Sequence, residues 1–171
     1  MDIVLEIIEN GVDNNQANPV VTYPAGTNTS RTNAKNILLN NIPFLKDEVI
    51  SYINSTYSAF EYDEELCSRD VEFITRAVAY DMVTGSNYQT VTAARGYLRS
   101  YASDVVTQAK QKHITLLAFK YLKNLLTNYV GGNTAAKNSI TTNMDTIINT
   151  VYAAYQSTVT AVTASNDRFT I

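Results

Sequence analysis

The chain has little of the chemistry on which most small enzymes and metalloproteins depend. Its 171 residues include one cysteine, Cys67, one histidine, His113, and no tryptophan. A single cysteine excludes an internal disulfide framework and a zinc site built from several cysteines, because both need partner thiols. A single histidine leaves little choice of base for a hydrolytic nucleophile. We therefore expect neither a metal nor a cofactor.

Excess positive charge and long apolar runs are also missing. The net charge is -3 at pH 7, and lysine and arginine form only one modest group, from Lys110 to Lys123. Such a chain is a poor candidate for neutralising the phosphates of nucleic acid. The first ten residues, MDIVLEIIEN, lack the basic flank and long apolar core of a signal peptide, and no later stretch is apolar enough to cross a bilayer. We expect no nucleic-acid partner and no membrane partner.

Apolar residues that recur every three or four positions predict a largely helical chain. We expect one all-α domain over residues 1–171, an irregular bundle of five or six helices, with a short tail at 166–171. The expected helices cover residues 2–10, 33–56, 64–84, 88–99, 104–130 and 134–165.

Local signals place several breaks between these helices. Pro43 removes an amide donor from the second one and predicts either a kink or a restart capped near Asn41. Asp63 is a typical N-cap, and Gly85 is a typical stop. Ser86 or Asn87 can cap the helix that follows Gly85, and Asn133 or Thr134 can open the last helix.

An extended arm is predicted at residues 12–32, where Pro19, Pro24, Gly26 and several asparagines replace the helical pattern. It is longer than an ordinary connection, which is typical of a packed arm or a contact surface. The long C-terminal helix at 134–165 is the other expected contact element. The interface candidates are Val20, Val21 and Tyr23 on the arm and Tyr152 and Tyr155 on the helix.

Two carboxylates border the apolar stripe of the helix after Asp63. Asp70 and Asp81 need partners there, and we predict a structural polar network of Arg69, Asp70, Asp81 and Arg95. An acid–base pair is the alternative, but three helical turns would separate Asp70 from Asp81 by about 16 Å. Cys67 and His113 also fall on apolar stripes, so we interpret them as packing residues.

A short internal echo links the two ends of the chain. Met1-Asp2-Ile3-Val4 and Met144-Asp145-Thr146-Ile147 both begin an amphipathic segment. The match is short enough to arise by chance. If it is real, the N-terminal segment repeats the last helix, as when one unit is taken from a string of similar units.

Four segments carry a family resemblance: NAKNILLNNIPFLKDEVISYI (33–53), CSRDVEFITRAVAYDMVTGSN (67–87), AARGYL (93–98) and QAKQKHITLLAFKYLKNLL (108–126). Together they resemble a recurrent helical module of structural proteins from tailed phages, especially marine cyanophages. Pro43 and the threonine-rich last helix depart from that module. The resemblance implies a virion protein, and nothing in it implies catalytic residues.

The resulting expectation is a non-enzymatic virion component of the tail, baseplate, neck or fibre-attachment apparatus, assembled in the bacterial cytoplasm. Its partners would be other virion proteins and further copies of itself within a symmetric particle. A capsid decoration protein is the close alternative. A host-receptor-binding module and a phage hydrolase that uses Asp70 and Asp81 are the others.

Overall fold

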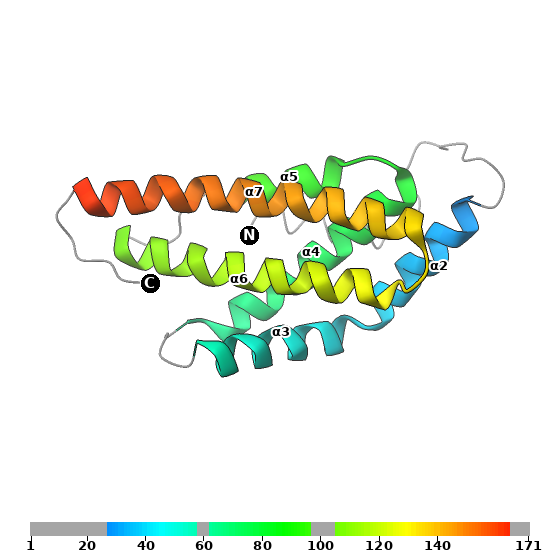
Figure 1. Cartoon of the computed structure of the whole chain (residues 1–171), viewed down its shortest axis with the longest axis horizontal. Helices are drawn as coiled ribbons and strands as arrows, with labels where there is room; N and C mark the ends of the chain where they lie inside the picture. The colour runs from blue at the N-terminus through cyan, green and yellow to red at the C-terminus, as the bar shows by residue number, and fades with distance from the viewer. Residues whose placement is uncertain (1–26, 58–61, 97–104, 165–171) are drawn as a thin grey trace.

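A computed structural model describes residues 27–57, 62–96 and 105–164 of the chain (Figure 1). Over these ranges the protein consists of six α-helices without a strand, which confirms the predicted all-α bundle. The helices are α2 (Thr27–Asn40), α3 (Ile42–Thr56), α4 (Glu64–Thr84), α5 (Tyr88–Gly96), α6 (Val105–Tyr129) and α7 (Thr134–Ala164). The predicted end of the last helix, at residue 165, lies outside the described residues.

Helix α4 is the centre of the bundle. It contacts each of the other five helices, while α6 and α7 lie side by side as a long antiparallel pair (Figure 1). Every residue of α4 from Ile74 to Met82 is buried except Arg76. This second half of α4 is therefore enclosed by its neighbours, whereas its first half keeps an exposed side.

The break at Pro43 is a restart. Helix α2 ends at Asn40, Asn41 is the N-cap of α3, and Pro43 lies in the first turn of α3. A proline costs no hydrogen bond in a first turn, because the amides there lack intrahelical acceptors. The Leu45 amide donates to the Asn41 carbonyl at 2.9 Å, which closes the first turn of the new helix.

The start of α2 differs from the sequence prediction. The helix begins at Thr27, so residues 27–32 of the predicted extended arm are helical. Threonine and asparagine form helices weakly, and no apolar residue marks the pattern before Ala34. A tertiary contact is present at this end, where the Asn133 side chain donates to the carbonyl and hydroxyl oxygens of Ser30 at 3.2 and 2.7 Å. The rest of the arm, with Val20, Val21 and Tyr23, lies outside the described residues.

The other helix boundaries follow the local signals. The Asp63 carboxylate accepts the Leu66 amide at 2.9 Å, and the Asn133 side-chain oxygen accepts the Ala136 amide at 3.0 Å. Gly85 ends α4 in the left-handed conformation, with φ of 70°. These caps confirm the predicted N-cap at Asp63, the stop at Gly85 and the opening of the last helix at Asn133.

The turn between α6 and α7 offers a matched test of backbone conformation. Gly131 has φ of 57° and Gly132 does not have a positive φ, yet a Cβ atom at either would meet no atom within 4 Å. We expect Gly131→Ala to lower the free energy of unfolding by about 1 kcal/mol. Gly132→Ala should leave it unchanged within about 0.5 kcal/mol. Urea denaturation measures both, and equal effects would contradict the assignment.

Candidate functional site

The buried carboxylate of Asp81 joins α4 to α5. Its Oδ1 accepts the Gln89 amide and the Ser86 hydroxyl, each at 3.2 Å, and its Oδ2 accepts the Thr90 amide at 2.7 Å. The two amides belong to the first turn of α5, where backbone donors have no intrahelical acceptor. Asp81 therefore caps α5 from the preceding helix.

This long-range cap adds to the predicted local one. The Asn87 carbonyl accepts the Val91 amide at 2.9 Å, and the Ser86 hydroxyl accepts the Tyr88 amide at 3.4 Å. Residue type and spacing indicate Ser86 and Asn87 because both directly precede α5. They cannot indicate Asp81, because its role depends on the direction in which the Gly85 turn sends the chain.

Burial dominates the ionisation of Asp81. Loss of solvent raises the pKa of the carboxyl, while the Thr90 and Gln89 amides and the Ser86 hydroxyl oppose the rise by stabilising the carboxylate. The side chain is fully buried. Full burial and three hydrogen bonds from the chain itself are typical of a carboxylate with a structural role.

The predicted polar network is not gathered at one place. Arg69 and Asp70 approach to 4.0 Å at the surface near the start of α4, with the Arg69 side chain 52% exposed. Asp81 lies about 18 Å further along the same helix from Arg69. The side chain of Arg95 lies outside the described residues, so a contact between Arg95 and Asp81 stays a prediction.

The same geometry bears on the hydrolase alternative. Asp70 and Asp81 lie on one uninterrupted helix, about 16 Å apart along its axis. The paired carboxylates of glycosidases are about 5 to 9.5 Å apart. The structure therefore does not bring Asp70 and Asp81 to a common reaction centre.

Glu72 forms an ion-pair link on the side of α4 opposite Asp81, and the sequence did not predict it. Glu72 accepts from Lys46 of α3 at 3.2 Å and from Arg76 of α4 at 3.1 Å. The spacing of Glu72 and Arg76, four residues apart, is a sequence signal for part of it. The Lys46 contact requires the packing of α3 on α4.

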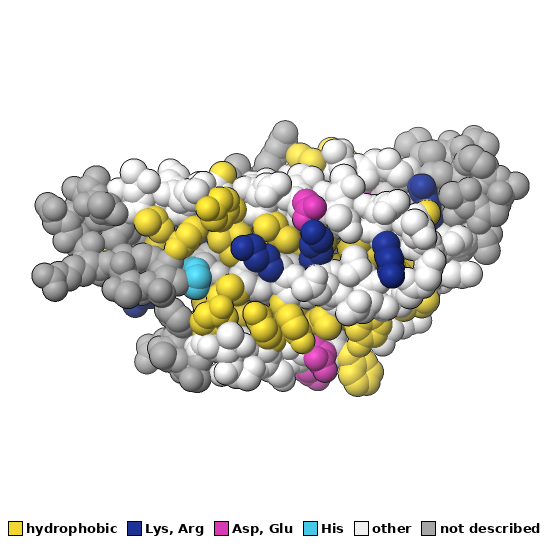
Figure 2. Space-filling view, in the orientation of Figure 1, with side chains coloured by type: hydrophobic (Ala, Val, Ile, Leu, Met, Phe, Trp, Pro, Cys, Tyr) yellow, Lys and Arg dark blue, Asp and Glu magenta, His cyan; other side chains and the backbone are white. Residues whose placement is uncertain are grey.

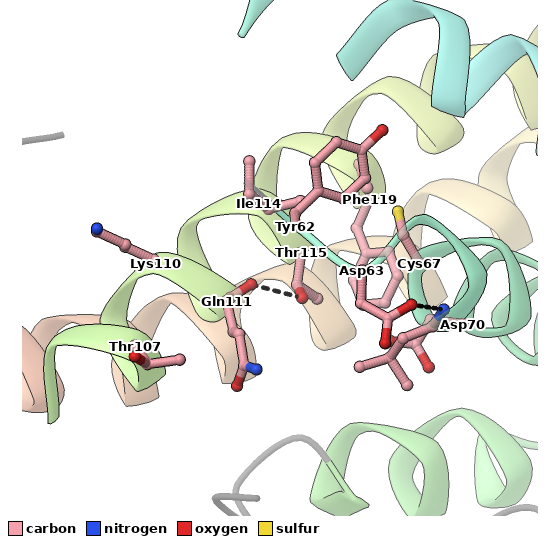
Figure 3. A pocket seen from close by; sticks show the side chains of 12 residues that line it. Tyr62, Asp63, Cys67, Asp70, Thr107, Lys110, Gln111, Ile114, Thr115 and Phe119 are labelled. Carbon is pink, nitrogen blue, oxygen red and sulfur yellow. Dashed lines mark hydrogen bonds between the residues drawn. The ribbon is translucent and has the colours of Figure 1, made fainter. Parts of the chain in front are cut away.

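A cavity of about 410 Å³ lies between the first turns of α4 and the first half of α6 (Figure 3). Its wall is partly apolar, and both helices contribute polar groups to it. The lining residues drawn and labelled there are Tyr62, Asp63, Cys67, Asp70, Thr107, Lys110, Gln111, Ile114, Thr115 and Phe119.

Cys67 places the one thiol of the chain at this cavity, and its environment keeps that thiol protonated. Burial raises the pKa of the thiol to about 12, and the carboxylates of Asp70, Glu64 and Asp63 add to the rise. A thiol is reactive as its thiolate, which is scarce at neutral pH under these conditions. Cys67 is buried, as the sequence predicts. No group of three or more potential metal ligands occurs among the described residues.

A partly exposed aromatic surface runs along the outside of α6. We define the tyrosine–histidine face by six half-buried residues on α6 and its neighbours: Tyr52, Tyr57, His113, Leu117, Tyr121 and Tyr155. Figure 2 shows hydrophobic side chains along both flanks of α6, with the histidine and several basic side chains beside them.

The rings of this face contact one another. Tyr52 and Tyr121 stack with centroids 4.1 Å apart, and the His113 ring lies 6.1 Å from Tyr57 and 5.8 Å from Tyr155. Burial and the charge of Lys120 lower the pKa of His113. His113 is therefore a core-edge residue, as predicted, and it borders solvent.

No protein family, curated protein or solved structure matches the chain. None of the helices in the described ranges combines the length and hydropathy that a membrane span requires. The protein is thus defined by its fold, an all-α bundle centred on α4.

Removal of the Asp81 carboxylate tests its capping role. Asp81→Ala would leave the Gln89 and Thr90 amides without their acceptor in the protein interior. We expect a loss of about 3 kcal/mol in the free energy of unfolding. Asp70→Ala, on the same helix near the surface, should cost less than about 1 kcal/mol. Comparable losses in urea denaturation would show that Asp81 has no special role.

Asp81 should also make stability depend on pH. Its pKa is raised in the folded protein, so the fold holds this proton more tightly than the unfolded chain does. The stability of the wild type relative to Asp81→Asn should therefore increase as pH falls through the raised pKa of the folded protein, and level off below the ordinary pKa of aspartate, about 4. Paired urea titrations across this range measure the difference. A constant difference, or one that shrinks on acidification, would contradict the assignment.

Proposed function

We propose that this protein is a non-enzymatic structural component of a phage virion, in the tail, baseplate, neck or fibre-attachment apparatus. It acts through protein–protein interfaces with other virion proteins and with copies of itself. The resemblance of four segments to phage structural modules supports the virion setting. The all-α bundle is compatible with rigid presentation of such interfaces.

The threonines of α7 are the observation that carries the interface role. Hydroxyl groups of the half-buried Thr146 and Thr150 and of the exposed Thr160 each donate to the carbonyl four residues earlier, at 2.8 to 3.0 Å. Their hydrogen bonds are thus already satisfied within the helix. A partner could cover this face without leaving hydroxyl donors unpaired, so the desolvation cost of association would be low.

An exposed tyrosine gives α7 a binding element. Tyr152 on α7 is 45% exposed, and its hydroxyl accepts from Gln156 at 3.0 Å. Tyrosine is enriched at the energetic centres of interfaces. Tyr155, the other candidate on α7, belongs to the tyrosine–histidine face and is half-buried within the chain itself.

The groups best suited to catalysis have structural roles that account for them. Asp81 caps α5, and the raised pKa of Cys67 keeps its thiol protonated. Asp70 borders the cavity near α6 but is far from Asp81. These assignments favour an assembly role over the hydrolase alternative.

Self-association of the full chain tests the proposal. We expect Tyr152→Ser to weaken it at least about tenfold, because loss of a central interface tyrosine costs more than about 1.4 kcal/mol. Tyr88→Ser is the matched control, since Tyr88 is exposed to a similar degree on α5. Sedimentation velocity over a range of concentrations gives the association constants. A monomeric wild type, or equal effects of the two substitutions, would contradict the interface on α7.

Electron microscopy of intact particles separates the virion alternatives. Density for this bundle in the tail, neck or baseplate supports the proposal, whereas density on the capsid lattice identifies a decoration protein. Absence from purified particles would overturn both.

A further inference from the structure

A hollow of about 690 Å³ lies at one end of the bundle, where α2, the turn after α4 and the first half of α7 meet (Figure 1). The side chains of its described wall are almost all polar, with three amides, three hydroxyls and one apolar side chain, Ala135. Sites for small molecules usually have about 300 to 1,000 Å³ and an apolar wall, so this wall suits a polar ligand. The amides are those of Asn87, Asn138 and Asn143, and the hydroxyls are those of Ser86, Ser139 and Thr142.

Asn143 places a buried amide at this hollow. The residue is 5% exposed and lines the hollow, so the little surface that it keeps faces the hollow. Its side-chain amide has no hydrogen-bond partner among the described residues. Burial of an amide without a partner costs stability, and most buried polar side chains in folded proteins have a partner. The donor and the acceptor of this amide are therefore left for an occupant of the hollow.

The polar groups of α7 beside Asn143 are available in the same way. Asn138, Ser139 and Thr142 share one face of the helix, and their side chains make no hydrogen bond with the described residues. Further along α7, the hydroxyls of Thr146 and Thr150 do bond to carbonyls within the helix. The hydroxyls at the hollow thus differ from the others of this helix in keeping their donors for a ligand.

The wall discriminates among classes of ligand. No described carboxylate lines it, which disfavours a cation. The amides of Tyr88, Gln89 and Thr90, which could hold an anion, already donate to Ser86 and Asp81.

A peptide partner would need apolar anchors, and Ala135 is the one apolar side chain of the described wall. A neutral molecule with several hydroxyl groups fits best, because amides and hydroxyls both donate and accept. Arg31 is the one ionisable residue of the described wall, and a guanidinium also donates to hydroxyl oxygens.

We infer that this hollow binds a neutral saccharide. The Asn143 amide is its buried contact, because one amide can accept from one sugar hydroxyl and donate to the next. Asn138, Ser139 and Thr142 bind further hydroxyls along α7. The inference goes beyond the assembly role and does not depend on a virion setting.

NMR titration of the full isotope-labelled chain tests the site. The probes are four neutral disaccharides, namely maltose, cellobiose, lactose and diacetylchitobiose. We expect at least one to bind with a dissociation constant on the order of 1 mM and to shift the side-chain amide signals of Asn143 and Asn138. A lack of response to all four would overturn the proposal and leave a hydrated polar hollow only.

Asn143→Leu separates a ligand contact from a structural role. The substitution removes the amide and roughly keeps the volume of the side chain. We expect saccharide binding to weaken at least about tenfold. The midpoint of urea denaturation should equal or exceed that of the wild type, because no hydrogen bond within the described protein is lost. Unchanged binding, or a clear fall in the midpoint, would assign the amide to the fold instead.

Two exposed asparagines on α7 provide a matched pair. Asn138 and Asn149 lie on the same face, three turns apart, and Asn138 lines the hollow whereas Asn149 does not. Asn138→Ala should weaken saccharide binding about threefold or more, because one hydrogen bond to the ligand is lost. Asn149→Ala should bind like the wild type. Equal effects of the two substitutions would contradict the location of the site.

Inorganic phosphate, titrated alone and in competition with the saccharide, tests the anion alternative that Arg31 raises. We expect phosphate to leave the Asn143 amide signals unchanged and to displace no saccharide. Phosphate that shifts these signals while the disaccharides do not would identify an anion site and overturn the saccharide assignment.

Discussion

The hydrogen bonds from the start of α5 to the Asp81 carboxylate are the constraint on which the arrangement of the bundle depends. Asp81 lies on α4, the helix that contacts all the others described, and α5 in turn packs against α7. Fixing the first turn of α5 to α4 therefore orients three helices together. The two amides and the Ser86 hydroxyl offset part of the cost of burying the carboxylate. An apolar residue at this position could not accept them.

Away from Asp81, packing contributes more than charge does. The pairs Lys46–Glu72 and Lys123–Asp145 join neighbouring helices at their margins, where all four side chains are partly exposed. Such pairs contribute roughly 0 to 1 kcal/mol each. The surface left over is divided between the threonine side of α7, whose hydroxyls bond within the helix, and the tyrosine–histidine face.

The helix boundaries that the sequence predicts correctly have local causes. The side chains of Asp63 and Asn133 each accept an amide three residues later, and Pro43 fits a first helical turn, so residue type and spacing suffice. The start of α2 at Thr27 was missed because its threonines and asparagines lack an apolar pattern. The cavity between α4 and α6 was missed for a different reason, since its walls come from segments far apart in the chain.

The sequence by itself determined the all-α class, the face that each helix buries and several helix ends. Periodicity, caps and glycines act over one or two turns, so neighbouring residues suffice to specify them. Only the tertiary structure decided what the carboxylates do. It assigned Asp81 to the amides of α5, left Asp70 near a surface cavity and exposed Tyr152 more than Tyr155. The physical reason is that burial and hydrogen-bond partners depend on which other helix covers a residue, and neighbouring residues in the chain do not specify that helix.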